Sequence, residues 1–294
     1  MRTRFISLAL VSLAIAGRTQ DVQEAEKAGL PLAEEDVARG LLETFAAARE
    51  AQDAVEVTAA LEAMHGYANP EFRAPALEGL EYGASSVDRK RVQEEAQTFG
   101  ITSKDENAER LSDLETGARI AGARLLGNIP GKESEGPLFK TLKQKDVRED
   151  RPQLAAAVID ALGRLGYDKA TKDVHKIFRD FSDVHTVPAA VRFFGQTKCK
   201  DKDIVMELCR QLEPPRQTSG SQLLTGAFAT GGQNERYKIW DASRKNLVWT
   251  LEQVTGQRWR ADDSGDDEDD DEGPSEAERA LEFVKENARE LGLK

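Results

Sequence analysis

Apolar residues recur along the middle of this chain at the three- and four-residue spacing of an α-helix, and the pattern stops repeatedly at a glycine. The stretch AGARLLG at 121–127 has near-copies in AVIDALG at 157–163 and AAVRFFG at 189–195. Glycine suits the end of a helix because it enters the left-handed conformation at little steric cost. We therefore expect helices to end at a series of marker glycines, 27 to 36 residues apart: Gly66, Gly100, Gly127, Gly163 and Gly195. In ALGRLG, Gly166 is the better candidate for the stop, and Gly163 is then a close-packing position in the last turn.

A second, shorter helix is predicted after the markers. Its apolar positions follow an i, i+3, i+4, i+7 pattern, which places them on one face of a helix. The two clearest sets are Val174, Ile177, Phe178 and Phe181, then Val205, Leu208, Cys209 and Leu212. Leu138, Phe139 and Leu142 follow the same pattern less completely. No long alternation of apolar and polar residues appears between these sets, so an all-α protein is predicted.

The stretch LAAAVIDALGRLGYDKATKDVHKIF, residues 154–178, resembles a HEAT repeat of the kind also found in phycobilisome-lyase-type HEAT-like proteins. The resemblance is best over 116–213 and extends more weakly back to about residue 52. It implies helix pairs stacked into a superhelix, because one pair cannot bury its apolar face alone. We therefore predict an all-α, HEAT-like α-solenoid of about five to six helix pairs over 52–213. An ordinary globular helical domain is the alternative.

Segments of different composition lie before and after the predicted repeats. Residues 17–51 are predicted to contain a capping helix with Ala38, Leu41, Leu42 and Phe45 at helical spacing. The Pro, Gly, Ser and Thr-rich residues 214–236 predict a loop with a short helical turn at 223–228. Residues 237–260 then predict a capping helix that begins at Asp241.

Two segments of opposite character follow. Residues 261–274 are acidic and predict a disordered linker. Residues 275–294 predict an amphipathic helix with Ser275 and Glu278 at capping-box spacing and Gly292 as its stop. That helix needs a partner surface, which is either the repeat array itself or another protein.

The first sixteen residues have the pattern of a secretory signal peptide. A basic head, MRTR, precedes an apolar run at 5–16 that ends in Ala14-Ile15-Ala16. We predict cleavage before Gly17, a secreted or periplasmic mature chain, and no stable membrane anchor afterwards. An uncleaved anchor is the alternative, although twelve apolar residues rise only about 18 Å as a helix.

The charge of the chain is unevenly distributed. The formal net charge is −12, and residues 262–272 contain nine acidic groups and no basic group. Residues 136–261 instead have a net charge of +7. A candidate binding stripe of lysines on or beside the second helices consists of Lys140, Lys143, Lys169, Lys172, Lys176, Lys200 and Lys202. The acidic linker is a candidate tethered competitor for this stripe; ordinary solvated lysines are the alternative.

Residue types that carry chemistry are few and scattered. The three histidines, His65, His175 and His185, belong to different predicted units, and no motif of a hydrolase, nucleotide-binding loop or metal site occurs. We therefore predict no catalytic residue, no cofactor and no metal. Cys209 is predicted to be buried and reduced, and Cys199 too far away to form a disulfide with it.

These patterns favour an exported, non-enzymatic scaffold for an unknown protein partner, with no nucleic acid bound. One alternative is a carbohydrate-binding module that uses the region of Trp240, Trp249 and Trp259. We interpret these rings first as a cap on the last repeat. Another alternative is an enzyme or chromophore-handling protein like the lyase-type relatives.

Overall fold

The computed structural model describes residues 30–180, 183–215, 229–259 and 274–294, with the side chains of 229–234 left aside. Within these ranges the chain is helical, with short connections and no strand. None of the described helices is long and apolar enough to cross a membrane. The chain divides into two compact units, Met1–Leu165 and Gly166–Lys294. The all-α prediction is confirmed.

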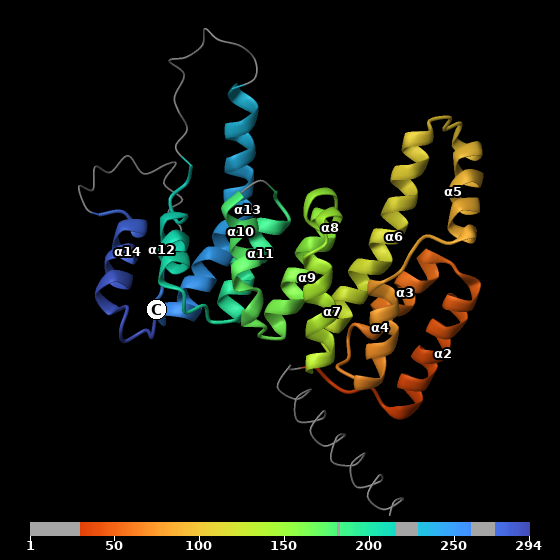
Figure 1. Ribbon diagram of the computed structural model, residues 1–294, viewed down its shortest axis with the longest axis horizontal. Helices are drawn as coiled ribbons and strands as arrows, with labels where there is room; N and C mark the ends of the chain where they lie inside the picture. The colour runs from red at the N-terminus through yellow and green to blue at the C-terminus, as the bar shows by residue number, and fades with distance from the viewer. Residues whose placement is uncertain (1–29, 181–182, 216–228, 260–273) are drawn as a thin grey trace, which may run out of the picture. The chain divides into compact units, whose positions relative to one another are not determined.

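The described part of the first unit, residues 30–165, contains eight α-helices and a short 3-10 helix (Figure 1). Their bounds are α2 Glu35–Ala51, α3 Ala54–Met64, η1 Pro70–Phe72, α4 Arg73–Leu80, α5 Ser86–Phe99, α6 Lys104–Leu126, α7 Lys132–Leu142, α8 Lys145–Asp150 and α9 Pro152–Arg164.

Three helices of the first unit form a row, since α6 packs against α3 on one side and α9 on the other. The shorter helices lie beside the row: α4 packs on α6, and α7 packs on α9. The apolar face of each helix is thereby covered by its neighbours, and Leu61, Leu125 and Leu162 are completely buried. This stacking of successive helix pairs is the solenoid-like arrangement predicted from the sequence.

Glycine allows the helices of the row to approach closely. A Cβ atom at Gly122 of α6 would lie 2.4 Å from the backbone nitrogen of Leu80 and 2.6 Å from the carbonyl oxygen of Ala76, both on α4. A Cβ atom at Gly127 would lie 2.7 Å from Cα of Ala161 on α9. Side-chain-free positions therefore set the distances between helices.

The marker glycines do not share one role, which corrects the sequence interpretation. Gly100 and Gly166 adopt left-handed backbone angles, with φ of 70° and 69°, as expected at a helix end. Gly127 caps α6 in the right-handed conformation, and Gly66 follows α3 without a positive φ. Gly195 lies inside a helix and is treated with the second unit below.

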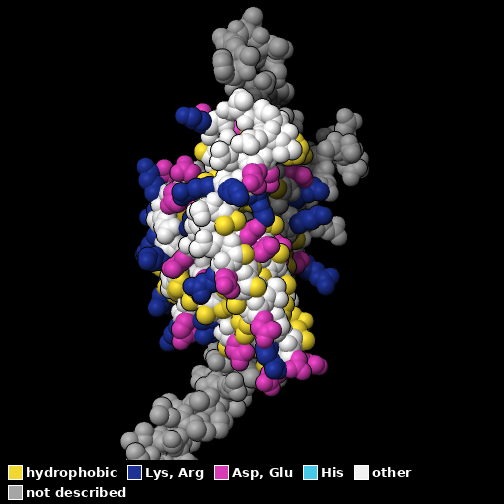
Figure 2. Space-filling view, turned by 90° about the vertical axis from the view of Figure 1, so that its right-hand side faces the viewer, with side chains coloured by type: hydrophobic (Ala, Val, Ile, Leu, Met, Phe, Trp, Pro, Cys, Tyr) yellow, Lys and Arg dark blue, Asp and Glu magenta, His cyan; other side chains and the backbone are white. Residues whose placement is uncertain are grey.

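Helix α5 is a further departure from the predicted regular repeat. It ends at the marker Gly100 but packs on α6 outside the row, because α3 contacts α6 directly. The chain between α4 and α6 is therefore an inserted helix rather than a repeat unit. Figure 2 views the first unit from the side of α2 and α5, where acidic and basic side chains are interspersed with scattered apolar ones.

A 3-10 helix and five α-helices make up the second unit where the structure describes it, outside 181–182, 216–228 and 260–273. Their bounds are η2 Asp168–Ala170, α10 Thr171–Asp180, α11 Thr186–Gln196, α12 Lys202–Arg210, α13 Ala229–Thr255 and α14 Glu276–Asn287. Helix α11 packs against α10 and α13, and α12 packs against α13 and α14. Val174, Phe178, Val205 and Leu208 are buried, as their spacing predicted; Phe181 lies outside the described residues.

Gly195 is in the interior of α11, where it allows α13 to approach. A Cβ atom there would lie 2.4 Å from Cζ3 of Trp249 and 2.8 Å from Oγ1 of Thr250. The hydroxyl of Thr250 donates to the carbonyl oxygen of Val191, one turn earlier on α11. The prediction that this glycine ends a helix was wrong, because a neighbouring ring needs the space that a side chain would fill.

The start of α13 also differs from the sequence interpretation. Asp241 was expected to begin this helix, but α13 starts at Ala229, inside the predicted loop 214–236. Ile239 and Trp240 are buried on the added part of the helix. Burial of this apolar pair outweighs the weak helix propensity of the residues before it.

The last helix docks on its own chain. Ser275 and Glu278 form the expected capping box, and α14 buries Ala277, Ala280 and Val284. Beyond it, Gly292 has φ of 66° and the chain returns to the start of α12. There the backbone of Lys294 accepts from Lys202 at 3.1 Å and donates to Lys200 at 2.9 Å. Of the two partners considered for this helix, the structure provides the repeat array.

Several predicted segments lie outside the described residues. These are the signal peptide at 1–16, the residues that follow it to 29, the turn at 223–228 and almost all of the acidic linker 261–274.

Candidate functional site

Two hollows lie on either side of the loop between α4 and α5 in the first unit. The first has a volume of about 220 Å³ and the second about 430 Å³. Tyr82 and Gly83 line both, so this loop forms a ridge between them. We refer to residues 81–85 as the Tyr82 ridge.

Asp88 holds the ridge in place although no water reaches it. Its carboxylate accepts from the hydroxyl of Tyr82 at 2.7 Å, from the backbone nitrogen of Ser85 at 2.8 Å and from that of Ala54 at 2.8 Å. Burial alone would raise the pKa of Asp88, but these hydrogen bonds outweigh it and lower the pKa. Asp88 thus joins the start of α3 to the start of α5, and its lowered pKa favours the ionised form.

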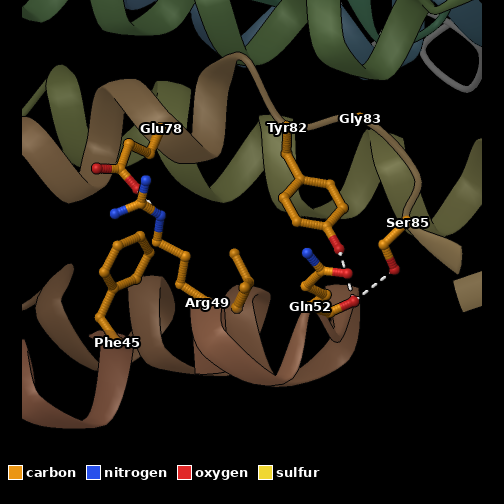
Figure 3. A pocket seen from close by; sticks show the side chains of 8 residues that line it. Phe45, Arg49, Gln52, Glu78, Tyr82, Gly83 and Ser85 are labelled. Carbon is orange, nitrogen blue, oxygen red and sulfur yellow. Dashed lines mark hydrogen bonds and ion pairs between the residues drawn. The ribbon is translucent and has the colours of Figure 1, made fainter. Parts of the chain in front are cut away.

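The first hollow lies between α2 and the ridge (Figure 3). Phe45 provides an apolar wall, and Arg49 reaches across to pair with Glu78 of α4 at 2.8 Å. At the other end, Tyr82 points toward the C-cap of α2, and its hydroxyl lies 3.3 Å from the carbonyl oxygen of Gln52. Burial and the neighbouring Asp88 raise the pKa of Tyr82, so this hydroxyl stays protonated.

The second hollow has a buried guanidinium at its base. Arg119 of α6 is only 8% exposed and donates through Nε to the carbonyl oxygen of Leu80 at 3.1 Å. Its Nη2 donates to Oε1 of Gln144 at 3.0 Å, and its Nη1 lies 3.7 Å from Glu115. Glu115 also accepts from Arg151 at 2.7 Å. Burial, with the nearby charge of Arg151, lowers the pKa of Arg119, which nevertheless remains a cation.

Lys140 is the predicted stripe residue that lines a hollow. It is exposed on α7, beside Thr141 and Gln144 in the wall of the second hollow. Among the described residues it has no ion-pair partner. Its ammonium group is therefore available to a ligand, unlike the paired Arg119.

The other stripe lysines lie on the elements that the sequence predicted or next to them. Lys143 follows α7 and covers the ring of Phe139, with Nζ 4.1 Å from its centroid. In the second unit, Lys200 donates to the carbonyl oxygen of Leu291 at 2.8 Å and so supports the C-terminal segment. The remaining members are Lys169 in η2, Lys172 and Lys176 on α10, and Lys202 at the start of α12. A continuous stripe across the two units stays a prediction.

The three tryptophans do not share one surface. Trp240 is 1% exposed and donates to the carbonyl oxygen of Gln211 at 2.9 Å. Trp249 lies nine residues later on α13, which places it on the opposite side of the helix. Trp259 contacts the ring of Phe283 edge-on, 5.6 Å between centroids. Trp240 therefore contacts the end of α12, Trp249 contacts α11 and Trp259 contacts α14, an arrangement that fits capping residues.

His65 and His175 are half-buried, His185 is exposed, and both cysteines are buried. The Nε2 atom of His175 lies 2.8 Å from Oε2 of Glu207 on α12, so this ring is paired with a carboxylate of the neighbouring helix. Burial, followed by the charges of nearby arginines, lowers the pKa of His65. Cys209 is a buried free thiol, as predicted, and Cys199 forms no disulfide with it and is buried as well. Burial raises the pKa of Cys199 to about 11 and that of Cys209 to about 12.

The described part of the chain holds no group of three or more histidine, cysteine or acidic side chains placed to bind a metal ion. What the two hollows offer is hydrogen bonding and charge. The carboxylates of Glu78 and Glu115 are paired with arginines, while Glu81 and Lys140 in the second hollow are exposed and have no ion-pair partner among the described residues. Sequence reasoning found Lys140 but missed Asp88, Tyr82 and Arg119. The S-x-x-D spacing at 85–88 was a usable signal for Asp88, whereas Arg119 resembles any surface arginine of an amphipathic helix.

Comparison of the chain with protein-family models, with curated proteins and with solved structures finds no match.

Proposed function

We propose that this chain is an exported, non-enzymatic scaffold of HEAT-like helix pairs that binds an extended segment of another protein across the Tyr82 ridge. The second hollow carries the proposal. It is open to solvent, lies between successive helix pairs, and combines an unpaired cation at Lys140 with the amide of Gln144 and the hydroxyl of Thr141. An extended peptide offers backbone and side-chain acceptors for such groups.

The pairing of the titratable groups favours binding over catalysis. A general acid or base needs a proton that it can exchange with a substrate. Around the ridge, Asp88 is held as an anion by three donors and Tyr82 is held as a phenol. Arg119 is fixed by Leu80, Gln144 and Glu115. These groups build a rigid surface rather than a reacting centre.

A binding experiment with matched charge reversals tests the proposal. The full chain, immobilised, is used to capture a partner from the envelope fraction of its own organism, and the purified partner is then titrated calorimetrically. Lys140→Glu should weaken binding at least about tenfold, because it places a like charge against the acceptors of the bound segment. Lys132→Glu, on the same helix but outside the hollow, should change the affinity less than about twofold.

Equal affinities of the two variants would place the partner elsewhere on the chain and refute the role of the second hollow. Chemical turnover of the captured molecule would refute the non-enzymatic assignment. Export is tested separately: an intact Met1 on protein recovered outside the cytoplasm would contradict cleavage before Gly17. Tryptophan fluorescence titrated with glycans tests the carbohydrate-binding alternative, since capping rings should give no response.

A further inference from the structure

Helix α5 and the first half of α6 form an arm that projects from the rest of the first unit (Figure 1). Helix α6 has 23 residues, against 11 in α3 and 13 in α9. At 1.5 Å per residue it is about 15 Å longer than either neighbour in the row. All buried residues of α6 lie between Ala118 and Leu126, so its first fourteen residues take no part in the buried core of the row.

The tip of the arm is apolar and uncharged. Phe99 ends α5 and is 71% exposed, the highest value among the exposed large apolar residues of the described chain. Residues 97–103, QTFGITS, contain no charged side chain in a protein of which 32% is charged. Gly100 turns the chain there with φ of 70°, and Ile101 follows beside Phe99. The arm thus presents a large aromatic ring at its farthest point.

The sides of the arm are acidic. Residues 93–110 contain five acidic and two basic side chains, a net charge of −3. Nη1 of Arg110 forms an ion pair with Oε2 of Glu95 at 3.6 Å. Asp105, Glu106 and Glu109 have no ion-pair partner among the described residues. An exposed aromatic ring at the tip of an arm with a net negative charge is complementary to an apolar pocket with a basic rim.

We propose that the tip of the α5–α6 arm is a docking site for a partner protein that receives Phe99 in an apolar pocket rimmed by Lys or Arg. This contact is separate from the Tyr82 ridge and does not depend on it. Aromatic anchors of this kind carry a large share of binding energy when a partner removes them from water.

Charge and pocket chemistry decide against two other occupants. An anionic membrane surface repels the acidic sides of the arm. In a second copy of this chain, the first hollow has an apolar wall at Phe45, but the cation beside it, Arg49, is already paired with Glu78. The second hollow and the hollow beside Trp259 have walls made mostly of charged or polar side chains. Such walls do not suit an aromatic ring without hydrogen-bonding groups.

Site-specific photo-crosslinking in the native cell is the first part of the test. A benzoylphenylalanine placed at position 99 of the full chain should give one discrete protein adduct. The same probe at Val87, which is 39% exposed near the base of α5, should not give it. After identification and purification of that protein, Phe99→Ala should weaken its binding at least about 30-fold, the factor of an interface hot spot.

Three controls separate this result from a folding defect or a different target. Val87→Ala should leave the affinity within about twofold, and neither alanine variant should move the urea midpoint of unfolding. Glu109→Lys should weaken binding at low salt and less at high salt. Phosphatidylcholine vesicles, with and without phosphatidylglycerol, should not sediment with the protein.

The proposal is overturned if position 99 gives no protein adduct, or the same adduct as position 87. It is also overturned if Phe99→Ala leaves the affinity unchanged, or if it abolishes vesicle binding or self-association seen by analytical ultracentrifugation. The Lys140→Glu variant should bind the arm's partner as tightly as the parent, and Phe99→Ala should leave binding at the Tyr82 ridge unchanged, so the two proposals fail independently.

Discussion

Replacing Gly122 by Ala tests directly whether close packing between α4 and α6 holds the first unit together. The new methyl group would lie 2.4 Å from the nitrogen of Leu80, 2.6 Å from the oxygen of Ala76 and 2.7 Å from the carbonyl carbon of Gly79. All three are backbone atoms, so no side chain can rotate away. Ordinary van der Waals contact would require the two helices to separate by about 1 Å.

The expected magnitude follows from two opposing effects. Overpacking of a well-packed core costs about 1–3 kcal/mol, and a clash with backbone on three sides belongs at the upper end. Alanine gains about 1 kcal/mol over glycine in a helix interior. We therefore expect a net loss of about 2 kcal/mol in the free energy of unfolding, measured by urea denaturation with circular dichroism at 222 nm.

Gly117→Ala is the matched control on the same helix. Its nearest neighbour would be Oγ1 of Thr58 at 3.8 Å, an ordinary contact. This variant should therefore keep only the gain in helix propensity and become more stable by up to about 1 kcal/mol. If Gly122→Ala proves as stable as Gly117→Ala, the close approach of α4 and α6 is not what the structure indicates.

Three further outcomes are expected. Gly195→Ala should push the ring of Trp249 toward solvent, giving a red-shifted tryptophan emission and a loss of about 1 kcal/mol; unchanged emission would contradict the contact. Cys199 and Cys209 should resist Ellman's reagent at pH 8 until urea is added, and rapid labelling of the native protein would refute their burial. Because the pKa values of both thiols are raised in the folded state, the thiols of the unfolded chain ionise first as pH rises. The free energy of unfolding should therefore fall between about pH 9 and pH 12. Asp88→Asn should cost about 3 kcal/mol by leaving donors unpaired. The ionised carboxylate of Asp88, whose pKa is lowered in the folded state, stabilises the fold, so the parent should lose stability as pH falls below 3.8. Asp88→Asn should not show this acid-dependent loss. Identical acid titrations of the two proteins would count against the role of Asp88.

Patterns that depend on neighbouring positions in the sequence predicted the structure well. The apolar spacing of 171–181 and 202–212 gave α10 and α12, because an amphipathic face must be buried whatever covers it. The capping box at Ser275 gave the start of α14 for a similarly local reason.

Features that depend on a distant neighbour were missed or misassigned. Gly195 has the sequence context of a helix stop, yet its role is to make room for Trp249, which lies on another helix. Arg119 is spaced from Glu115 like a surface ion pair, and only the approach of α4 buries it. The site residues that require such tertiary contacts could therefore not be found from periodicity alone.

The start of α13 was placed too late for a different reason. Their glycines and polar side chains predict a loop, whereas Ile239 shares a helical face with Ser243 and Leu247 at spacings of four. Extending that face backwards would have moved the helix start ahead of Asp241.

The return of the C-terminal segment to α12 has a consequence for synthesis of the protein. The backbone pair between Lys294 and Lys200 cannot form until more than ninety residues after Lys200 have been translated. At about 5–20 residues per second, this leaves the side of α12 that α14 covers without its partner for roughly 5–20 s. During that interval the nascent chain exposes an amphipathic helix that a chaperone can hold. Translation of the segment up to Lys294, rather than folding of the repeats, is then the event that closes the second unit.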